Sequence, residues 1–323
     1  MAKDFTVCVG TLGSGIWRST DGGESWSRAR GNFPMDCRVY GVTAHPKDPA
    51  VILAGTHAGI YRSDDRGATF EQLDAPFNDV DVWKIAFDQT NLDNIFAGTR
   101  PAAIYRSQDG GQHWDKLPVD IVEECPNVGV PRVTGLTVDP TDGNNIWVGV
   151  EVDGARRSLD GGNTWTRVAG GVDDPDIHDT MVCAVNPKTV LISTPMEIFA
   201  STDSGEAFRR LEVHKSFPMP YCRELAQRPD DPSVIFVGNG NGAMGDTGAI
   251  QRTKDLGESW ETLNLPVIPN APIWSFATNA ADSDLVLACS HYGQVFASAD
   301  GGDWWIKMRR EFTEIRGLAW VPN

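Results

Sequence analysis

An eight-residue pattern recurs seven times along the chain: a hydroxyl residue, any residue, Asp, any residue, Gly, two further residues, and then Trp or Phe. The first copy is STDGGESW, at residues 19–26. The Asp residues fall at 21, 65, 109, 160, 203, 255 and 300, so consecutive copies are 43 to 52 residues apart. A period of this length over a whole chain is typical of β-propellers and solenoids. The sequence therefore predicts a repeat architecture with seven units.

Residues 38–73 show what one unit contains. RVYGVTAHP, VILAGT and GIYRS are short strand-like runs, and SDDRGATF then leads into FEQL. Four short strands separated by turn residues predict an antiparallel meander. Because one such sheet cannot cover both of its faces, it must pack against its neighbours around an axis. We therefore expect an all-β, seven-bladed β-propeller of four-stranded antiparallel blades, formed by residues 1–323 as a single domain.

The two ends of the chain predict how the ring closes. The chain begins with what corresponds to the second strand of a unit, FTVCVGT, and ends with an unpaired first strand, EIRGLAWVPN. Pairing these two strands would complete the first blade and cover an exposed edge.

The recurring turn has a structural explanation. Asp and Ser side chains bond backbone N–H groups within their own loop, and Gly supplies the positive φ that such a loop needs. The closing Trp or Phe can then be buried between sheets. We therefore interpret the pattern as a fastening for a β-turn, without a direct role in chemistry.

The seven turns resemble the Asp-box, or BNR, repeats of sialidases and related propellers, over essentially the whole chain. In that family the turn joins the third and fourth strands of a blade, away from the catalytic face. Its members include sialidases, other glycosidases and noncatalytic scaffolds such as photosystem II assembly factors. The resemblance implies the fold and does not choose among these functions. No FRIP-like segment, which is typical of sialidases, is found here.

Composition narrows the classes of partner. The formal net charge is −16, which disfavours nucleic acids and anionic membranes as partners. No apolar run has the length of a signal peptide or a membrane span. Six Cys residues without CxxC spacing are expected to be reduced, mostly buried thiols in a cytoplasmic protein. The oligomeric state does not follow from the sequence.

Basic and aromatic residues collect where loops of different blades should meet. In a propeller, ligands usually bind where the loops before the first strands approach those between the second and third strands. Guanidinium groups from several blades could bind a carboxylate or phosphate there, or could pair with neighbouring Asp and Glu residues. Aromatic rings could contact the same ligand, or could pack between blades. The predicted substrate-binding residues are Arg38, Arg100, Arg132, Arg223, Arg316, Trp83, Trp274 and Tyr221.

Residues that could transfer protons map to the same face. Histidine titrates near neutral pH and can act as a general acid or base. The candidate catalytic residues are His57, His178, His291, Glu151, Glu224 and Tyr292. No cofactor is expected. As an alternative, the three histidines could hold a divalent metal with Glu151 or Asp179, although no HExxH motif supports this.

Two classes of function fit these residues. The first is a hydrolase or lyase for a small anionic or sugar-like substrate in the axial pocket, with His and acidic groups moving protons and arginines binding a carboxylate. The alternative is a noncatalytic scaffold that binds a protein partner through an Arg-rich face. A carbohydrate-binding module is a third possibility. A recessed set of arginines would favour a small-molecule or glycan ligand, and a flat, exposed set would favour the scaffold.

Overall fold

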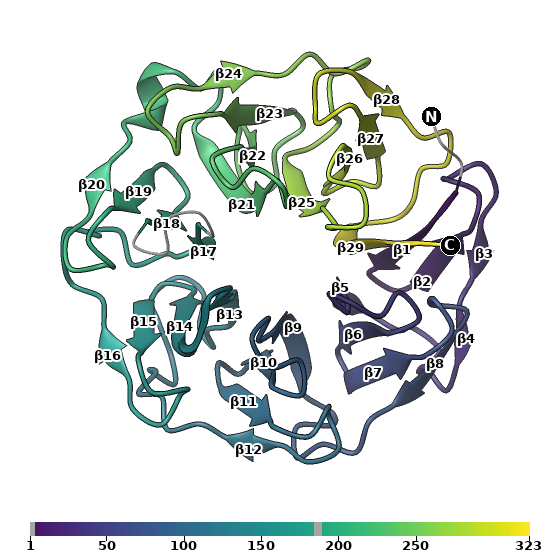
Figure 1. Cartoon of the computed structure of the whole chain (residues 1–323), viewed down its shortest axis with the longest axis horizontal. Coiled ribbons are helices and arrows are strands. Elements are labelled where there is room, and N and C mark those ends of the chain that lie inside the picture. Colours follow the sequence, from purple (N-terminus) through teal and green to yellow (C-terminus); the bar gives the residue numbers. More distant parts are fainter. Residues whose placement is uncertain (1–3, 184–188) are drawn as a thin grey trace.

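The chain forms seven antiparallel sheets around a central axis (Figure 1). This holds for residues 4–183 and 189–323, which the computed structural model describes. Each sheet is a blade of four strands, and one blade carries an additional short strand, β4 (Arg30–Gly31), which pairs in parallel with β8. The helix assigned in these ranges is a single 3-10 turn, η1 (Val213–Lys215). The predicted seven-bladed propeller is confirmed.

The blades follow one another along the chain. The first consists of β29 (Ile315–Pro322), β1 (Phe5–Thr11), β2 (Gly15–Ser19) and β3 (Ser27–Arg28). The second consists of β5 (Val39–Ala44), β6 (Ile52–Thr56), β7 (Gly59–Ser63) and β8 (Thr69–Gln72). The third consists of β9 (Asp81–Phe87), β10 (Ile95–Arg100), β11 (Ile104–Ser107) and β12 (Asp115–Lys116).

The remaining four blades repeat this order. The fourth consists of β13 (Val133–Asp139), β14 (Asp142–Val150), β15 (Gly154–Ser158) and β16 (Thr166–Arg167). The fifth consists of β17 (Asp179–Val182), β18 (Val190–Ser193), β19 (Ile198–Ser201) and β20 (Arg209–Arg210). The sixth consists of β21 (Tyr221–Gln227), β22 (Ile235–Gly240), β23 (Gly248–Thr253) and β24 (Glu261–Thr262). The seventh consists of β25 (Ile273–Ala277), β26 (Leu285–Ser290), β27 (Val295–Ala299) and β28 (Trp305–Lys307).

The last strand closes the ring by completing the first blade. β29 pairs antiparallel with β1, with Val7 opposite Trp320 and Thr6 opposite Val321. The first and last strands of the chain therefore lie in the same blade (Figure 1). This closure, which the two chain ends predicted, gives the first blade its fourth strand and pairs the inner edge of β1.

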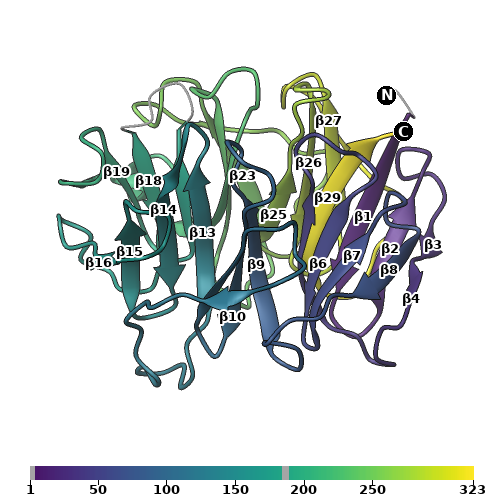
Figure 2. The ribbon, with the colours of Figure 1, turned by 60° about the horizontal axis from the view of Figure 1, so that its bottom comes forward.

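The hydrophobic core lies between neighbouring blades. Val7 and Val9 of the first blade, for example, pack with Leu285 and Leu287 of the seventh. Similar clusters join the other pairs of blades, whose sheets stand face to face around the axis (Figure 2). Since each blade covers the face of the next, the ring holds its seven first strands around a fixed axis.

The recurring turn fastens the third strand of a blade to the fourth. In the first copy, the Ser19 hydroxyl donates to Asp21 and accepts the N–H of Gly23, whose φ is 91°. Asp21 accepts the backbone and hydroxyl groups of Ser25, and these bonds lower the pKa of its carboxyl to about 2. The ring nitrogen of Trp26 donates to the carbonyl of Gly23. The turn thus serves as the local fastening that the sequence predicted.

Removing one of these hydroxyls should lower stability without affecting the axis. Ser63 is buried, donates to Asp65 and accepts the backbone N–H groups of Asp65 and Gly67. We expect Ser63→Ala to lower the free energy of unfolding by about 1–2 kcal/mol, because buried N–H groups lose their acceptor. Urea denaturation measures this. The exposed Ser216 serves as a control, since Ser216→Ala removes only one weak bond; an equal loss in both variants would contradict this role for the turn.

Candidate functional site

A small pocket lies on the axis where the first strands and their preceding loops converge. Its free space is about 30 Å³, which is room for one or two water molecules or a comparably small chemical group. The residues that line it are Tyr40, Trp83, Lys84, Arg132, Thr134, His178, Arg223, Glu224, Trp274 and Arg316. They come from all seven blades, so the pocket exists only in the closed ring.

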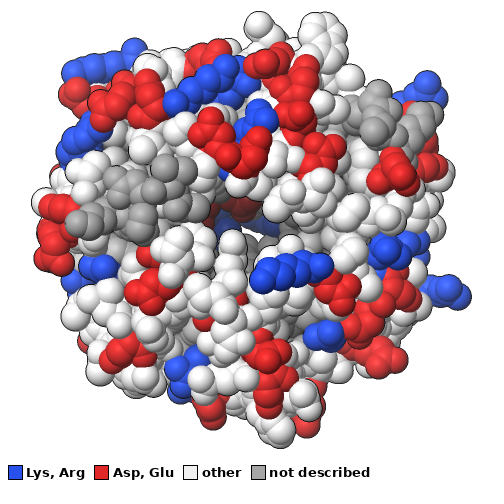
Figure 3. Space-filling view, in the orientation of Figure 1, with Lys and Arg blue, Asp and Glu red and all other residues white. Residues whose placement is uncertain are grey.

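Below the pocket the axis widens into a channel. Its volume is about 730 Å³, and it opens beside the turns that join the first and second strands of the blades. Its wall includes apolar side chains such as Val42, Leu136 and Phe276. Figure 3 shows one face of the ring, hollowed at its centre with both basic and acidic atoms visible in its depth. Lys84, Glu224 and Arg316 line both spaces and therefore lie at the boundary between them.

Two tryptophans hold three arginines around the pocket. The guanidinium carbons of Arg223 and Arg316 lie 3.7 and 4.1 Å from the ring centroid of Trp274. Both guanidinium groups therefore pack against the Trp274 side chain. Trp83 is contacted in the same way by Arg132, at 4.2 Å, and by the ring of Tyr40, at 4.3 Å. These contacts show that the tryptophans orient guanidinium groups at the pocket.

The arginines keep hydrogen-bond donors without partners. Arg132 Nη2 pairs with Glu151 at 2.6 Å, and Arg316 Nε pairs with Glu314 at 2.7 Å. For Arg223, the part of the chain that is described holds a bond to the hydroxyl of Tyr221 at 3.2 Å but no carboxylate partner. Buried N–H groups without an acceptor remain at Arg132 Nε, Arg223 Nε, Arg316 Nη1 and Trp83 Nε1. An unpaired buried donor is costly, so these N–H groups are available to an acceptor such as a bound anion.

The positive charges also repel one another. Burial, and then the neighbouring Arg223 and Arg132, lower the pKa of Arg316 to about 10 in spite of Glu314. The pKa of Arg132 is likewise lowered, by burial and by Arg223 and Arg100, although Glu151 opposes this. A bound anion would relieve this repulsion while accepting the free N–H groups.

The three predicted histidines do not converge. His178 lines the pocket and lies 2.6 Å from the Cys222 carbonyl through Nδ1, which must carry the proton because a carbonyl only accepts. Burial, together with Arg223, lowers the pKa of His178 well below its usual value, so Nε2 keeps a free lone pair at neutral pH.

The other two histidines lie outside the pocket lining. His291 lies behind Trp274 and pairs with Glu314 at 2.7 Å, and His57 accepts the N–H of Arg38 in a surface loop. Over residues 4–183 and 189–323, no group of three or more His, Cys, Asp or Glu side chains could hold a metal ion. The alternative metal site at the three histidines is therefore wrong.

Two carboxylates lie next to the pocket residues Arg132 and His178, although neither is part of the pocket lining. Glu151, at the end of β14, is bound by Arg132 but leaves Oε2 buried without a partner. Asp176, in the loop before β17, has its Oδ2 3.7 Å from His178 Nε2 and its Oδ1 buried without a partner. Burial, and then Glu151 and Asp174, raise the pKa of Asp176 to about 6. One carboxyl is thus placed to hold a proton near neutral pH while its neighbour is ion-paired, which is a typical environment for an acid and a base.

The remaining sequence-predicted residues have other positions. Arg38 is exposed, and Arg100 donates to the Val130 carbonyl. The ring of Tyr221 packs against the ring of His178 in a T-shaped arrangement. Tyr292 packs against His291, and neither tyrosine is part of the pocket lining. The pocket thus brings together three of the five predicted arginines, both tryptophans, His178 and Glu224. The sequence did not single out Asp176, Thr134 or Glu314.

Two further sequence-based expectations concern the cysteines and membrane spans. All six cysteines are free and buried. Among the described residues, no helix is long and apolar enough to cross a membrane.

Comparisons with known proteins find two groups of similar chains, while no family model matches. Xyloglucanase Xgh74A of Acetivibrio thermocellus is 26% identical over 316 residues, which are 81% of this chain but 37% of that protein. A probable oligoxyloglucan-reducing end-specific xyloglucanase of Neosartorya fischeri is 29% identical over 127 residues, which are 36% of this chain and 16% of that protein. The chain therefore spans well under half the length of these curated relatives. The photosystem II assembly lipoprotein Ycf48 of a Synechococcus strain is 26% identical over 261 residues, covering 79% of this chain and 70% of that protein.

Solved structures of both groups are also similar to the chain. The GH74 enzyme of Niastella koreensis has a TM-score of 0.69 at 19% identity, over 87% of this chain and 46% of that one. YCF48 from Cyanidioschyzon merolae has a TM-score of 0.57 at 15% identity, over 83% of this chain and 84% of that one. The chain is a seven-bladed β-propeller. Its predicted resemblance to the assembly-factor propellers is confirmed as a likeness of fold.

Proposed function

We propose that the chain is a hydrolase acting on a small acidic sugar or sugar-like substrate, whose carboxylate enters the axial pocket. The observation that carries this proposal is the set of unpaired N–H groups on Arg132, Arg223 and Arg316. Planar guanidinium groups bind a carboxylate through two parallel hydrogen bonds. Since the free space suits a carboxylate and not a ring, the rest of the substrate stays at the mouth of the pocket.

The two carboxylates beside Arg132 supply acid–base chemistry at that mouth. Asp176, with its raised pKa, protonates the leaving oxygen. Glu151, ion-paired with Arg132, assists the attacking water or stabilises positive charge that develops on the sugar. His178 accepts a hydrogen bond from a substrate hydroxyl through its unprotonated Nε2.

The similar proteins support a sugar substrate. Xyloglucanases recur among the curated relatives, and the GH74 enzymes share the fold of this chain. The arginine pocket adds the requirement for an anion. A lyase reaction on the same acidic substrate would use the same carboxylate site, with a base removing a proton beside the carboxylate.

A noncatalytic binding role is the second candidate. It is favoured by the coverage of Ycf48, whose length this chain matches far better than that of the xyloglucanases. A scaffold that binds a protein through an Arg-rich face would expose its arginines. Here Arg223 is buried, with 7% of its surface exposed, and it lies in a pocket. This recessed position favours a small acidic group as the ligand.

The test uses the whole chain with matched acidic and neutral substrates. Fluorogenic glucuronides and galacturonides are compared with the corresponding glucosides and galactosides, and products from unlabelled uronic-acid oligosaccharides are identified by mass spectrometry. We expect turnover of an acidic substrate with addition of water. An unsaturated product would instead identify a lyase. Binding of the acidic sugar without turnover would show that the chain is a noncatalytic binding module. Preference for neutral sugars would contradict the proposed anion pocket.

A further inference from the structure

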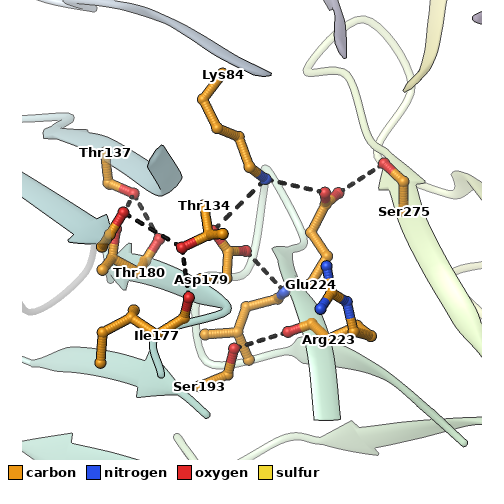
Figure 4. A network of polar contacts seen from close by, with 12 residues as sticks. Lys84, Thr134, Thr137, Ile177, Asp179, Thr180, Ser193, Arg223, Glu224 and Ser275 are labelled. Carbon is orange, nitrogen blue, oxygen red and sulfur yellow. Dashed lines mark hydrogen bonds and ion pairs between the residues drawn. The ribbon is translucent and has the colours of Figure 1, made fainter. Parts of the chain in front are cut away.

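Lys84 extends across the axis at the floor of the pocket. It belongs to β9 in the third blade, and its Nζ lies 3.3 Å from Glu224 on β21 and 3.8 Å from Asp179 on β17 (Figure 4). Strand β13 lies between β9 and β17 in the ring, since it contacts both. Lys84 thus ties together blades that are not neighbours and separates the pocket from the channel.

Both carboxylate oxygens of Glu224 have partners in this network. Its Oε1 accepts the hydroxyl of Ser275 at 2.9 Å and the N–H of Phe276 at 3.0 Å, while its Oε2 faces Lys84 (Figure 4). Within the described part of the chain, Glu224 is the one carboxylate among the residues that line the pocket. These bonds therefore fix the orientation of the Glu224 carboxylate.

Glu224 is also the immediate neighbour of Arg223. Consecutive side chains of a regular strand point to opposite faces. In β21 the register shifts between Cys222 and Leu225, and both Arg223 and Glu224 line the pocket. A glutamate released from Lys84 would have beside it the guanidinium of Arg223, which has no carboxylate partner among the described residues.

We propose that Lys84 is a positioning residue that holds Glu224 away from Arg223 and so keeps the pocket open to an external carboxylate. This inference rests on the proposed anion pocket. It adds that Lys84 prevents the chain's own Glu224 from neutralising Arg223. Without Lys84, Glu224 and Asp179 lose their shared counter-ion. Glu224 then pairs with Arg223 and competes with the ligand from within the same molecule, where its effective concentration is high.

The charge state of Lys84 agrees with this role. Burial lowers the pKa of Lys84, but Asp179 and Glu224 outweigh burial, so that its pKa is raised overall. The cation that restrains Glu224 is therefore present throughout the neutral pH range.

A double-mutant cycle tests the inference by binding alone, without turnover. The probe is D-glucuronate, and its affinity is measured by calorimetry for the whole chain, Lys84→Met, Glu224→Gln and the double variant. We expect Lys84→Met to weaken binding about 10-fold or more, because an internal carboxylate now competes. The double variant should bind within about threefold of Glu224→Gln, since a neutral amide cannot neutralise Arg223.

Two further variants keep the test decisive. Ser275→Ala removes a bond to Glu224 without removing a cation, so it should also weaken binding, and Glu224→Gln should again restore it. Lys47→Met makes the same charge change as Lys84→Met at the other end of the channel and should leave the affinity unchanged.

The possible outcomes separate this inference from the proposed function. A double variant as weak as Lys84→Met would show that Lys84 binds the anion directly and would overturn the positioning role. Unchanged affinity in both Lys84→Met and Ser275→Ala would overturn it too. Failure of the unmodified chain to bind glucuronate would contradict the anion pocket, and the inference with it.

Discussion

Replacing Arg223 by Met is expected to lower kcat/KM for an acidic substrate about 100-fold, a loss of roughly 2.7 kcal/mol in transition-state stabilisation. Arg223 is the pocket arginine for which no carboxylate partner is found among the described residues, so its whole charge is available to a ligand. Truncating one member of a buried charge pair costs about 2–5 kcal/mol, which includes the expected value. Steady-state kinetics with matched acidic and neutral substrates measure the effect.

The controls for this prediction follow from the same geometry. Arg38→Met makes an identical charge change at an exposed position outside the pocket and should leave kcat/KM nearly unchanged. Arg223→Lys keeps the charge but not the paired donors, so it should fall between the two. Thermal denaturation confirms folding, because Arg223 also stacks on Trp274. Equal losses for acidic and neutral substrates would show that Arg223 supports the structure and does not bind the acid group.

The fold could be predicted from the sequence because its main determinant is local. Each turn such as residues 19–26 carries its own hydrogen-bonding residues, and seven copies at a regular spacing fix the number of blades. Pairing of the first and last strands followed from the unfilled position in the first blade. These inferences need no knowledge of distances between remote residues.

The site could be predicted only in part, because burial and side-chain direction depend on the closed ring. Arg132 and Arg316 were identified because they begin inner strands, and they do reach the pocket. Arg38 has a similar position in the sequence but is exposed, and in its blade Tyr40 lines the pocket. Asp176 lies in the acidic segment DDPDIHD, which resembles an ordinary solvated loop. Its position two residues before His178 was the available signal, and its buried oxygen becomes evident only in the structure.

Replacing Asp176 by Asn should have the largest effect on activity. A positioned general acid contributes about 10²–10⁴-fold to a rate, so we expect kcat to fall roughly 1000-fold with a smaller change in KM. Asp173→Asn is a suitable control, because Asp173 is exposed and pairs with Arg210. A substrate whose leaving group needs no protonation should restore much of the lost rate, which a merely structural role for Asp176 would not explain.

The pH dependence provides a second measurement of the same residue. The pKa of Asp176 is raised to about 6, mainly by burial and then by Glu151 and Asp174, while Arg223 and Arg132 oppose the shift. The neighbouring His178 stays neutral because its own pKa is lowered. A general acid must be protonated, so kcat/KM should fall as the pH rises through about 6, and this limb should disappear in Asp176→Asn. A profile that is unchanged in the variant would assign the acid to another group, since the proton lost on this limb would not belong to Asp176.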